Sequence, residues 1–138
     1  MKILLDTNII IDFLTAREPF SKDAKKVVAL VETREVKGYI SASSVTTIHY
    51  LCSKVFDEKK ADEIVKELLE IFDITFIDKS TFLEAVLSKG SDFEDSVISQ
   101  SAKQNDIDII ISRDKTGFKN SPVLTMEPEK FLASMSIN

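Results

Sequence analysis

The sequence has little of several residue types, and each scarcity excludes a class of site or of protein. Among its 138 residues are one cysteine, Cys52, and one histidine, His49. The chain therefore cannot form an internal disulfide, and it lacks the cysteine and histidine set that a structural zinc site needs. Any bound metal ion must be held by oxygen atoms. Three glycines and three prolines, with 43% hydrophobic and 30% charged residues, are typical of an ordinary globular protein rich in helix.

Long hydrophobic runs are also missing. No stretch approaches the roughly 20 apolar residues of a membrane span, and the apolar run at the N-terminus is too short for a secretory signal. We therefore expect a cytoplasmic protein without a membrane partner. A length of 138 residues predicts a single domain that spans residues 1–138.

Positive charge is in the minority. Lysine and arginine number 18 against 23 acidic residues, which gives a formal net charge of −5. This balance argues against a broad basic surface that binds nucleic acid by charge alone. It leaves a nucleic-acid substrate open, because acids gathered in one pocket become a cation site once a divalent ion binds there.

The chain is organised around residues 2–14, KILLDTNIIIDFL. Residues 3–5 form a continuous apolar run typical of a buried parallel strand, and the apolar residues that follow recur at helical intervals. Asp6 and Asn8 are therefore expected at the carboxyl edge of a strand, where open α/β sheets bind ligands. The alternative is that Asp6, Thr7 or Asn8 only caps the helix.

Strands and helices alternate along the rest of the chain. The apolar pattern predicts further strands at 39–41, 74–77, 107–112 and 123–125, and further helices at 21–34, 45–55, 57–72, 81–87, 91–105 and 128–135. Ser43 or Ser44 is expected to cap the helix at 45–55, Thr81 with Glu84 to form a capping box, and Gly90 to end the helix that follows Thr81. The alternation predicts an α/β fold, a three-layer α/β/α sandwich with a mainly parallel sheet.

Two helices carry expectations about burial. In the helix at 45–55, Cys52 is expected in the core, His49 at the surface or in packing contacts, and Val55 on the buried side. The helix at 81–87 is expected to present its apolar residues to the core: Phe82, Leu83, Val86 and Leu87.

Acidic residues recur near the predicted carboxyl edge. The strand at 107–112 ends on Ser112 and is followed by Arg113 and Asp114, while the helix at 91–105 places Asp95 in its first turn. Asp95 is the acid on this helix that we expect to project toward Asp6 and Asp114. Asp92 is open between a capping and a ligating role, and Glu94 with Ser91 is expected to form a capping box.

Carboxylates gathered in one pocket repel one another unless a cation neutralises them or some remain protonated. Ligation by oxygen alone favours Mg²⁺ or Mn²⁺. Such an ion lowers the pKa of a bound water and shields phosphate oxygens, so phosphodiester hydrolysis is the reaction class that fits.

Three segments together resemble a known family. KILLDTNIIIDFL, DFEDSVISQSA and IIISRDKTGF, in this order and at these separations, resemble a PIN-domain ribonuclease, in particular the small stand-alone toxins of bacterial toxin–antitoxin pairs. The resemblance covers nearly the whole chain. It implies a sheet of about five parallel strands between helices, a Mg²⁺ or Mn²⁺ ion held by acids, and endonucleolytic cleavage of RNA. It also implies a small antitoxin partner and a homodimer.

The family's site residues carry over by position. The resemblance implies catalytic and metal-binding roles for Asp6, Asp95 and Asp114, supporting polar roles for Asn8 and Ser112, and RNA contacts for Arg113 and Lys115. The second acid of many members is absent, because Thr47 stands at the position that lines up best. Asp92 or Glu94 is then a candidate to replace it.

Two other functions compete with a ribonuclease. An aspartyl phosphatase also has an Asp after an apolar strand, but its usual second Asp is replaced here by Asn8. A non-catalytic RNA-binding or scaffold module of the same fold is favoured by Thr47 in place of an acid.

Overall fold

The computed structural model describes residues 1–88, 92–114 and 116–136. The strands are β1 (Lys2–Leu5), β2 (Lys37–Ser41), β3 (Asp73–Thr75), β4 (Ile109–Ile111) and β5 (Leu124–Met126). The helices are α1 (Thr7–Leu14), α2 (Ser21–Glu32), α3 (Ala42–Val55), α4 (Glu58–Ile71), α5 (Lys79–Leu87), α6 (Phe93–Gln104) and α7 (Pro128–Ser136).

The five strands form one sheet in the order β3-β2-β1-β4-β5, and every neighbouring pair is parallel. β1 lies at the centre, with Leu4 opposite Tyr39 of β2 and opposite Ile110 of β4. Because all five strands run the same way, their carboxyl ends meet at one edge of the sheet. The predicted three-layer fold with a parallel sheet is confirmed.

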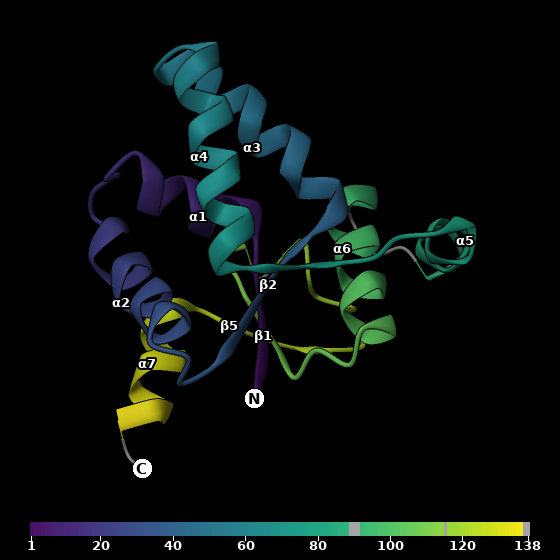
Figure 1. Cartoon of the computed structure of the whole chain (residues 1–138). Coiled ribbons are helices and arrows are strands. Elements are labelled where there is room, and N and C mark those ends of the chain that lie inside the picture. Colours follow the sequence, from purple (N-terminus) through teal and green to yellow (C-terminus); the bar gives the residue numbers. More distant parts are fainter. Residues whose placement is uncertain (89–91, 115, 137–138) are drawn as a thin grey trace.

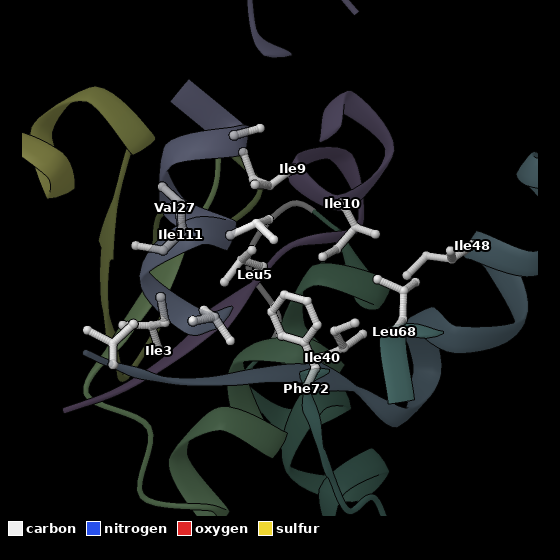
Figure 2. Close-up of a cluster of buried hydrophobic side chains, with 14 of the residues drawn as sticks. Ile3, Leu5, Ile9, Ile10, Val27, Ile40, Ile48, Leu68, Phe72 and Ile111 are labelled. Carbon is white, nitrogen blue, oxygen red and sulfur yellow. The ribbon is translucent and has the colours of Figure 1, made fainter. Parts of the chain in front are cut away.

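The two faces of the sheet are covered by different helices, as Figure 1 shows. Alternate side chains of a strand point to opposite faces, so Ile3 and Leu5 join the core on one side and Leu4 joins the core on the other. The larger core contains side chains of α1, α2, α3, α4 and α7, and Figure 2 shows part of it around Leu5. The smaller core contains Ile98 and Ala102 of α6, and α5 packs against the outside of α6.

Three helices begin at caps other than those expected. α3 is capped by Ser41, whose hydroxyl accepts a hydrogen bond from the Ser43 amide, because the extended backbone of β2 leads into the helix without a turn. α5 begins earlier than expected, and Asp78 forms its capping box with Thr81, in place of Thr81 with Glu84.

α6 also departs from the expected box. Asp92 caps this helix, and its Oδ1 accepts a hydrogen bond from the Asp95 amide at 2.9 Å. The capping box of Ser91 and Glu94 is therefore wrong, since the helix begins at Phe93. Ser91 and the expected stop at Gly90 lie outside the described residues.

Several apolar side chains expected in the core are exposed. α5 turns Thr81 and Ala85 toward α6 and leaves outside the four residues expected to be buried, Phe82, Leu83, Val86 and Leu87. Val55 is exposed at the end of α3. β3 ends at Thr75, the partner of the last residue of β2, so Phe76 lies beyond the sheet and is exposed as well. The helical periodicity identified these helices but not which side of α5 faces the protein.

Other expectations hold. Cys52 is fully buried in the larger core, and His49 is partly exposed with its Nε2 atom 2.6 Å from Oδ1 of Asp62 on α4. Within the described ranges, none of the helices is both long and apolar enough to span a bilayer.

Candidate active site

Asp6 is the first residue after β1 and the N-cap of α1. It is 4% exposed, and both carboxylate oxygens accept hydrogen bonds: Oδ1 from the Thr7 amide at 2.8 Å and Oδ2 from the Ser112 hydroxyl at 2.9 Å. The interpretation of Asp6 as the cap of α1 is therefore correct. It does not account for the contact with Ser112, which lies 106 positions away in the chain.

Ser112 joins the ends of two neighbouring strands. It follows β4 and is fully buried, and its hydroxyl donates to Asp6 while accepting a hydrogen bond from the Asp114 amide at 2.9 Å. β1 and β4 are adjacent parallel strands, so their carboxyl ends bring Asp6 and Asp114 to the same edge. Ser112 thus makes one hydrogen bond to each of the two segments.

Asp95 reaches this edge from α6, a helix on the opposite face of the sheet from α1. Its amide is held by the cap residue Asp92, and its carbonyl accepts a hydrogen bond from the Ser99 hydroxyl one turn later. Its carboxyl group is only partly buried, and Asp92 and Asp114 are exposed.

Gly117 was not anticipated from the sequence, and it lies against two of the three acids. Its amide donates to Oδ1 of Asp114 at 3.0 Å. A Cβ at this position would overlap the carboxylate of Asp95 and stand 2.9 Å from Oδ2 of Asp114. The backbone at Gly117 therefore lies directly beside both carboxylates, and a side chain at this position would require the Asp95 carboxylate to move. A glycine three positions after an acid was the one available signal in the sequence.

The electrostatics show that the acids act on one another. The pKa of Asp95 is raised to about 7, first by burial and then by the charges of Asp6, Asp92, Asp114 and Glu94. Burial also raises the pKa of Asp6, against the hydrogen bonds from Ser112 and Thr7, and the charges of Asp114 and Glu94 add to the rise. Three separate segments thus contribute carboxylates to one negative field, as carboxylates sharing a site do.

The residues at this edge fit a hard divalent cation by their chemistry. The donors are carboxylate and hydroxyl oxygens, the class that Mg²⁺ and Mn²⁺ prefer. Two buried hydroxyls at the edge, Thr7 Oγ1 after Asp6 and Ser44 Oγ in the first turn of α3, make no hydrogen bond within the protein. In the described part of the chain, however, no three acidic, histidine or cysteine side chains already stand in a geometry ready to ligate a metal ion.

The remaining expected site residues are not drawn into this group. Asn8 is exposed in the first turn of α1, and Thr47 is partly buried on α3, one turn after Ser44. Lys115 lies outside the described residues.

Arg113 has a partner within the protein, and its expected RNA contact stays a prediction. Its guanidinium makes two hydrogen bonds to the buried carboxylate of Asp12 on α1, at 2.7 and 3.1 Å, and lies over the ring of Phe20. Asp12 was another residue that sequence reasoning missed. Its acid side chain in the apolar run IIIDFL was the available signal, because a charge on the buried side of a helix requires a partner.

Comparison with known proteins gives a similar sequence and similar folds. The chain is 29% identical over 132 residues to Ribonuclease VapC1 of Aquifex aeolicus (strain VF5), and the match covers 91% of each protein. Its fold is similar to that of VapBC2 from Rickettsia felis, solved bound to a DNA fragment from their promoter. For that pair the TM-score is 0.70 at 15% identity, with 92% of this chain and 98% of the other covered. It is also similar to a toxin–antitoxin complex from Klebsiella pneumoniae, with a TM-score of 0.69, 22% identity, and 91% and 97% coverage.

A family model provides the assignment. The model described as PIN domain matches residues 2–116, which contain β1 to β4 and the three acids at the carboxyl edge of the sheet. The chain belongs to the PIN domain family.

Proposed function

We propose that this protein is a metal-dependent endoribonuclease that hydrolyses RNA phosphodiester bonds through Asp6, Asp95 and Asp114. The observation that carries the proposal is the mutual electrostatic effect of three carboxylates that arrive at one sheet edge from α1, α6 and the segment after β4. Membership of the PIN domain family and the similarity to Ribonuclease VapC1 support the reaction class.

The three acids are metal ligands in this proposal. Asp6 is a fixed ligand, because hydrogen bonds from Thr7 and Ser112 hold both of its oxygens. Asp114 is a second ligand, oriented by the Gly117 amide. Asp95 is the third candidate ligand: burial and the charges of the other acids raise its pKa in the metal-free protein, and a bound cation would favour its ionised form. A Mg²⁺ or Mn²⁺ ion held by these carboxylates would supply an activated water and neutralise charge on the phosphate.

Other polar residues support the site in this proposal. Ser112 orients Asp6 and the Asp114 segment, and Asp92 adds negative charge while it caps α6. Asn8 and Thr47 are assigned to water or phosphate, and Lys115 to an RNA phosphate, on the basis of their sequence positions. A hydroxyl at Thr47 is a poorer cation ligand than a carboxylate, so the strength of metal binding rests on the other acids.

Incubation of the purified protein with labelled RNA tests the proposal. The reactions contain Mn²⁺, Mg²⁺ or a chelator, and the variants are Asp95→Asn and Asp114→Asn. The matched control is Glu58→Gln, an exposed first-turn acid at the start of α4. We expect defined cleavage products with wild type and Glu58→Gln in the presence of metal, and none with the two site variants.

A second function has specific support and gives a different result in the same assay. Thr47 in place of an acid, and the lack of a metal-ready group of three in the described ranges, favour a PIN fold that binds RNA without cutting it. Retention of labelled RNA with no cleavage under any metal condition would establish that function and refute the nuclease.

We also propose a small antitoxin partner and a cytoplasmic location, where the RNA substrate is found. The similarity to chains solved as a toxin–antitoxin complex and as VapBC2 supports the partner. Native purification of the tagged protein from its own cells tests this, with co-purification of a small protein encoded beside it as the expected result. Recovery of the nuclease alone, under conditions that preserve known complexes, would contradict the partner.

A homodimer completes the proposal. It is supported by the apolar side of α5, which is exposed although contact between apolar side chains and water is unfavourable. The exposed residues are Phe82, Leu83, Val86 and Leu87. Light scattering at micromolar concentration should give twice the monomer mass of 15.5 kDa, and Val86→Glu should shift it toward the monomer. A wild-type mass of 15.5 kDa would refute the dimer, and an unchanged dimer in Val86→Glu would remove α5 from the interface.

A further inference from the structure

Asp12 and Arg113 form a partly buried ion pair beside the candidate active site. Asp12 lies on α1 and is 1% exposed. Arg113 donates from Nε to Oδ2 at 2.7 Å and from Nη2 to Oδ1 at 3.1 Å, the two-pronged geometry that fixes a guanidinium relative to a carboxylate. The pair thus ties the segment after β4 rigidly to α1.

A second contact restricts the same side chain. The guanidinium carbon of Arg113 lies 3.8 Å from the centre of the Phe20 ring, the residue just before α2. An arginine stacked on an aromatic face and paired with a carboxylate has little rotational freedom. Arg113 is therefore held from two directions, by α1 and by the chain that enters α2.

The restraint on Arg113 also affects its neighbours in the sequence, Ser112 and Asp114. It stands between Ser112, which donates to Asp6, and Asp114, whose amide donates back to Ser112. Asp6 and Asp12 belong to the same short stretch of chain, one capping α1 and the other lying within it. The segment of Ser112 to Asp114 is thus attached to α1 at both ends of the helix's first two turns.

We propose that Asp12 and Arg113 are positioning residues, which fix the Asp114 carboxylate relative to Asp6 by clamping the segment after β4 onto α1. The consequence for metal binding rests on the function proposed above, whereas the clamp itself does not. In this proposal Arg113 acts within the protein, in place of the RNA contact expected from its position next to Asp114.

The test compares Asp12→Asn, Arg113→Gln and the double variant with Lys119→Gln, which removes one exposed positive charge from the same loop. Amide hydrogen exchange in labelled protein reports on Asp114 and Gly117, whose amides donate to Ser112 and Asp114 respectively. Calorimetric titration with Mn²⁺ and RNA binding at several salt concentrations are measured on the same samples. The metal and RNA readouts do not require catalysis.

We expect faster exchange at Asp114 and Gly117 in Asp12→Asn and Arg113→Gln, and wild-type exchange in Lys119→Gln. Mn²⁺ affinity should fall about tenfold in both clamp variants, the lower range for residues that orient metal ligands. The double variant should be no worse than the poorer single variant, because the two residues act as one pair. It also keeps the proposal testable if Arg113→Gln, which strands a buried charge on Asp12, fails to fold.

Two results would overturn the clamp. One is wild-type exchange at Asp114 and Gly117 in Asp12→Asn and in the double variant. The other is an effect confined to Arg113→Gln, with weaker RNA binding and a smaller salt dependence, which identifies a phosphate contact. If wild type binds no Mn²⁺, the proposed function fails, and the exchange measurements still decide whether the clamp exists.

Discussion

Replacing Asp95 with asparagine should stabilise the metal-free protein. The substitution keeps the shape of the side chain and the backbone bonds to Asp92 and Ser99, and it removes one of the negative charges near Asp6 and Asp114. Most substitutions at a partly buried polar position destabilise, so a gain is a specific expectation. It follows because burial, and after it the charges of the neighbouring acids, raises the pKa of Asp95, so that its ionised form destabilises the folded protein.

The magnitude comes from the raised pKa of Asp95. A pKa of about 7 in place of 3.8 corresponds to at most about 4 kcal/mol, at about 1.4 kcal/mol for each step of one in pKa. Asp95 is partly exposed, and solvent screens interactions of such a group strongly, so we expect a gain of about 1 kcal/mol. For a chain of this size that is an increase in Tm of about 4 °C.

The gain should depend on pH in a definite direction. A carboxyl group with a higher pKa in the folded protein stabilises it at low pH, and that stabilisation is lost as pH rises through the folded pKa. For Asp95 the window runs from about 4 to about 7. Wild type should therefore fall further below Asp95→Asn at pH 8 than at pH 5.

Urea unfolding at pH 5 and pH 8 with a chelator present measures both quantities. The matched control is Glu58→Gln, because it removes an acid from the first turn of α4 and should cost a few tenths of a kcal/mol through the helix dipole alone. If Asp95→Asn behaves like this control at both pH values, the Asp95 carboxylate is neither buried nor close to the other acids, and the assignment of the site is wrong.

Four further substitutions test separate parts of the structure. Ser112→Ala should lower the free energy of unfolding in urea by about 1–3 kcal/mol, because Oδ2 of the buried Asp6 and the Asp114 amide lose this partner. A decrease below about 0.5 kcal/mol would contradict the hydrogen bonds described. Gly117→Ala should weaken Mn²⁺ binding about 10- to 100-fold in a calorimetric titration, since its Cβ would displace the Asp95 carboxylate, and wild-type affinity would place Gly117 outside the site. Phe131→Ala should cost about 3–5 kcal/mol because Phe131 is fully buried, whereas Leu87→Ala should stay within about 0.5 kcal/mol unless α5 is covered in a dimer.

The sequence was most informative where hydrophobic pattern alone determines structure. The continuous apolar runs before Asp6 and before Ser112 form strands of a parallel sheet that is covered on both faces. Such strands have no polar side, so a continuous apolar run identifies them. Their shared direction then placed the following acids at one edge. The expectation that Asp95 acts on Asp6 and Asp114 follows from this topology, and the raised pKa of Asp95 agrees with it.

Helix ends and exposed faces were harder to predict. Each misjudged cap had a second Ser, Thr or Asp nearby with the same chemistry. For α3 the choice depends on where β2 ends, because the helix follows that strand directly. α5 shows the same limit in its packing, because Thr81 and Ala85 fit closely against α6 while larger apolar residues remain outside. Periodicity indicates that a helix has an apolar side, but tertiary contacts decide whether that side is buried.

Two residues near the acids needed the structure. Gly117 contributes only its backbone and the space its missing side chain leaves, neither of which a pattern of residue types can express. The pairing of Arg113 with Asp12 could not be predicted, because it depends on a contact across 101 positions of sequence.

The most direct test of the account is the location of a bound ion. Crystals soaked in millimolar Mn²⁺ and measured at the manganese absorption edge report its position without any assay of activity. The account predicts one anomalous peak at the carboxyl edge of the sheet, within ligand distance of Asp6 and Asp114 and close to Asp95, and no such peak in Asp95→Asn at the same concentration. A wild-type crystal with no peak at this edge, or with manganese bound only elsewhere on the surface, would contradict it.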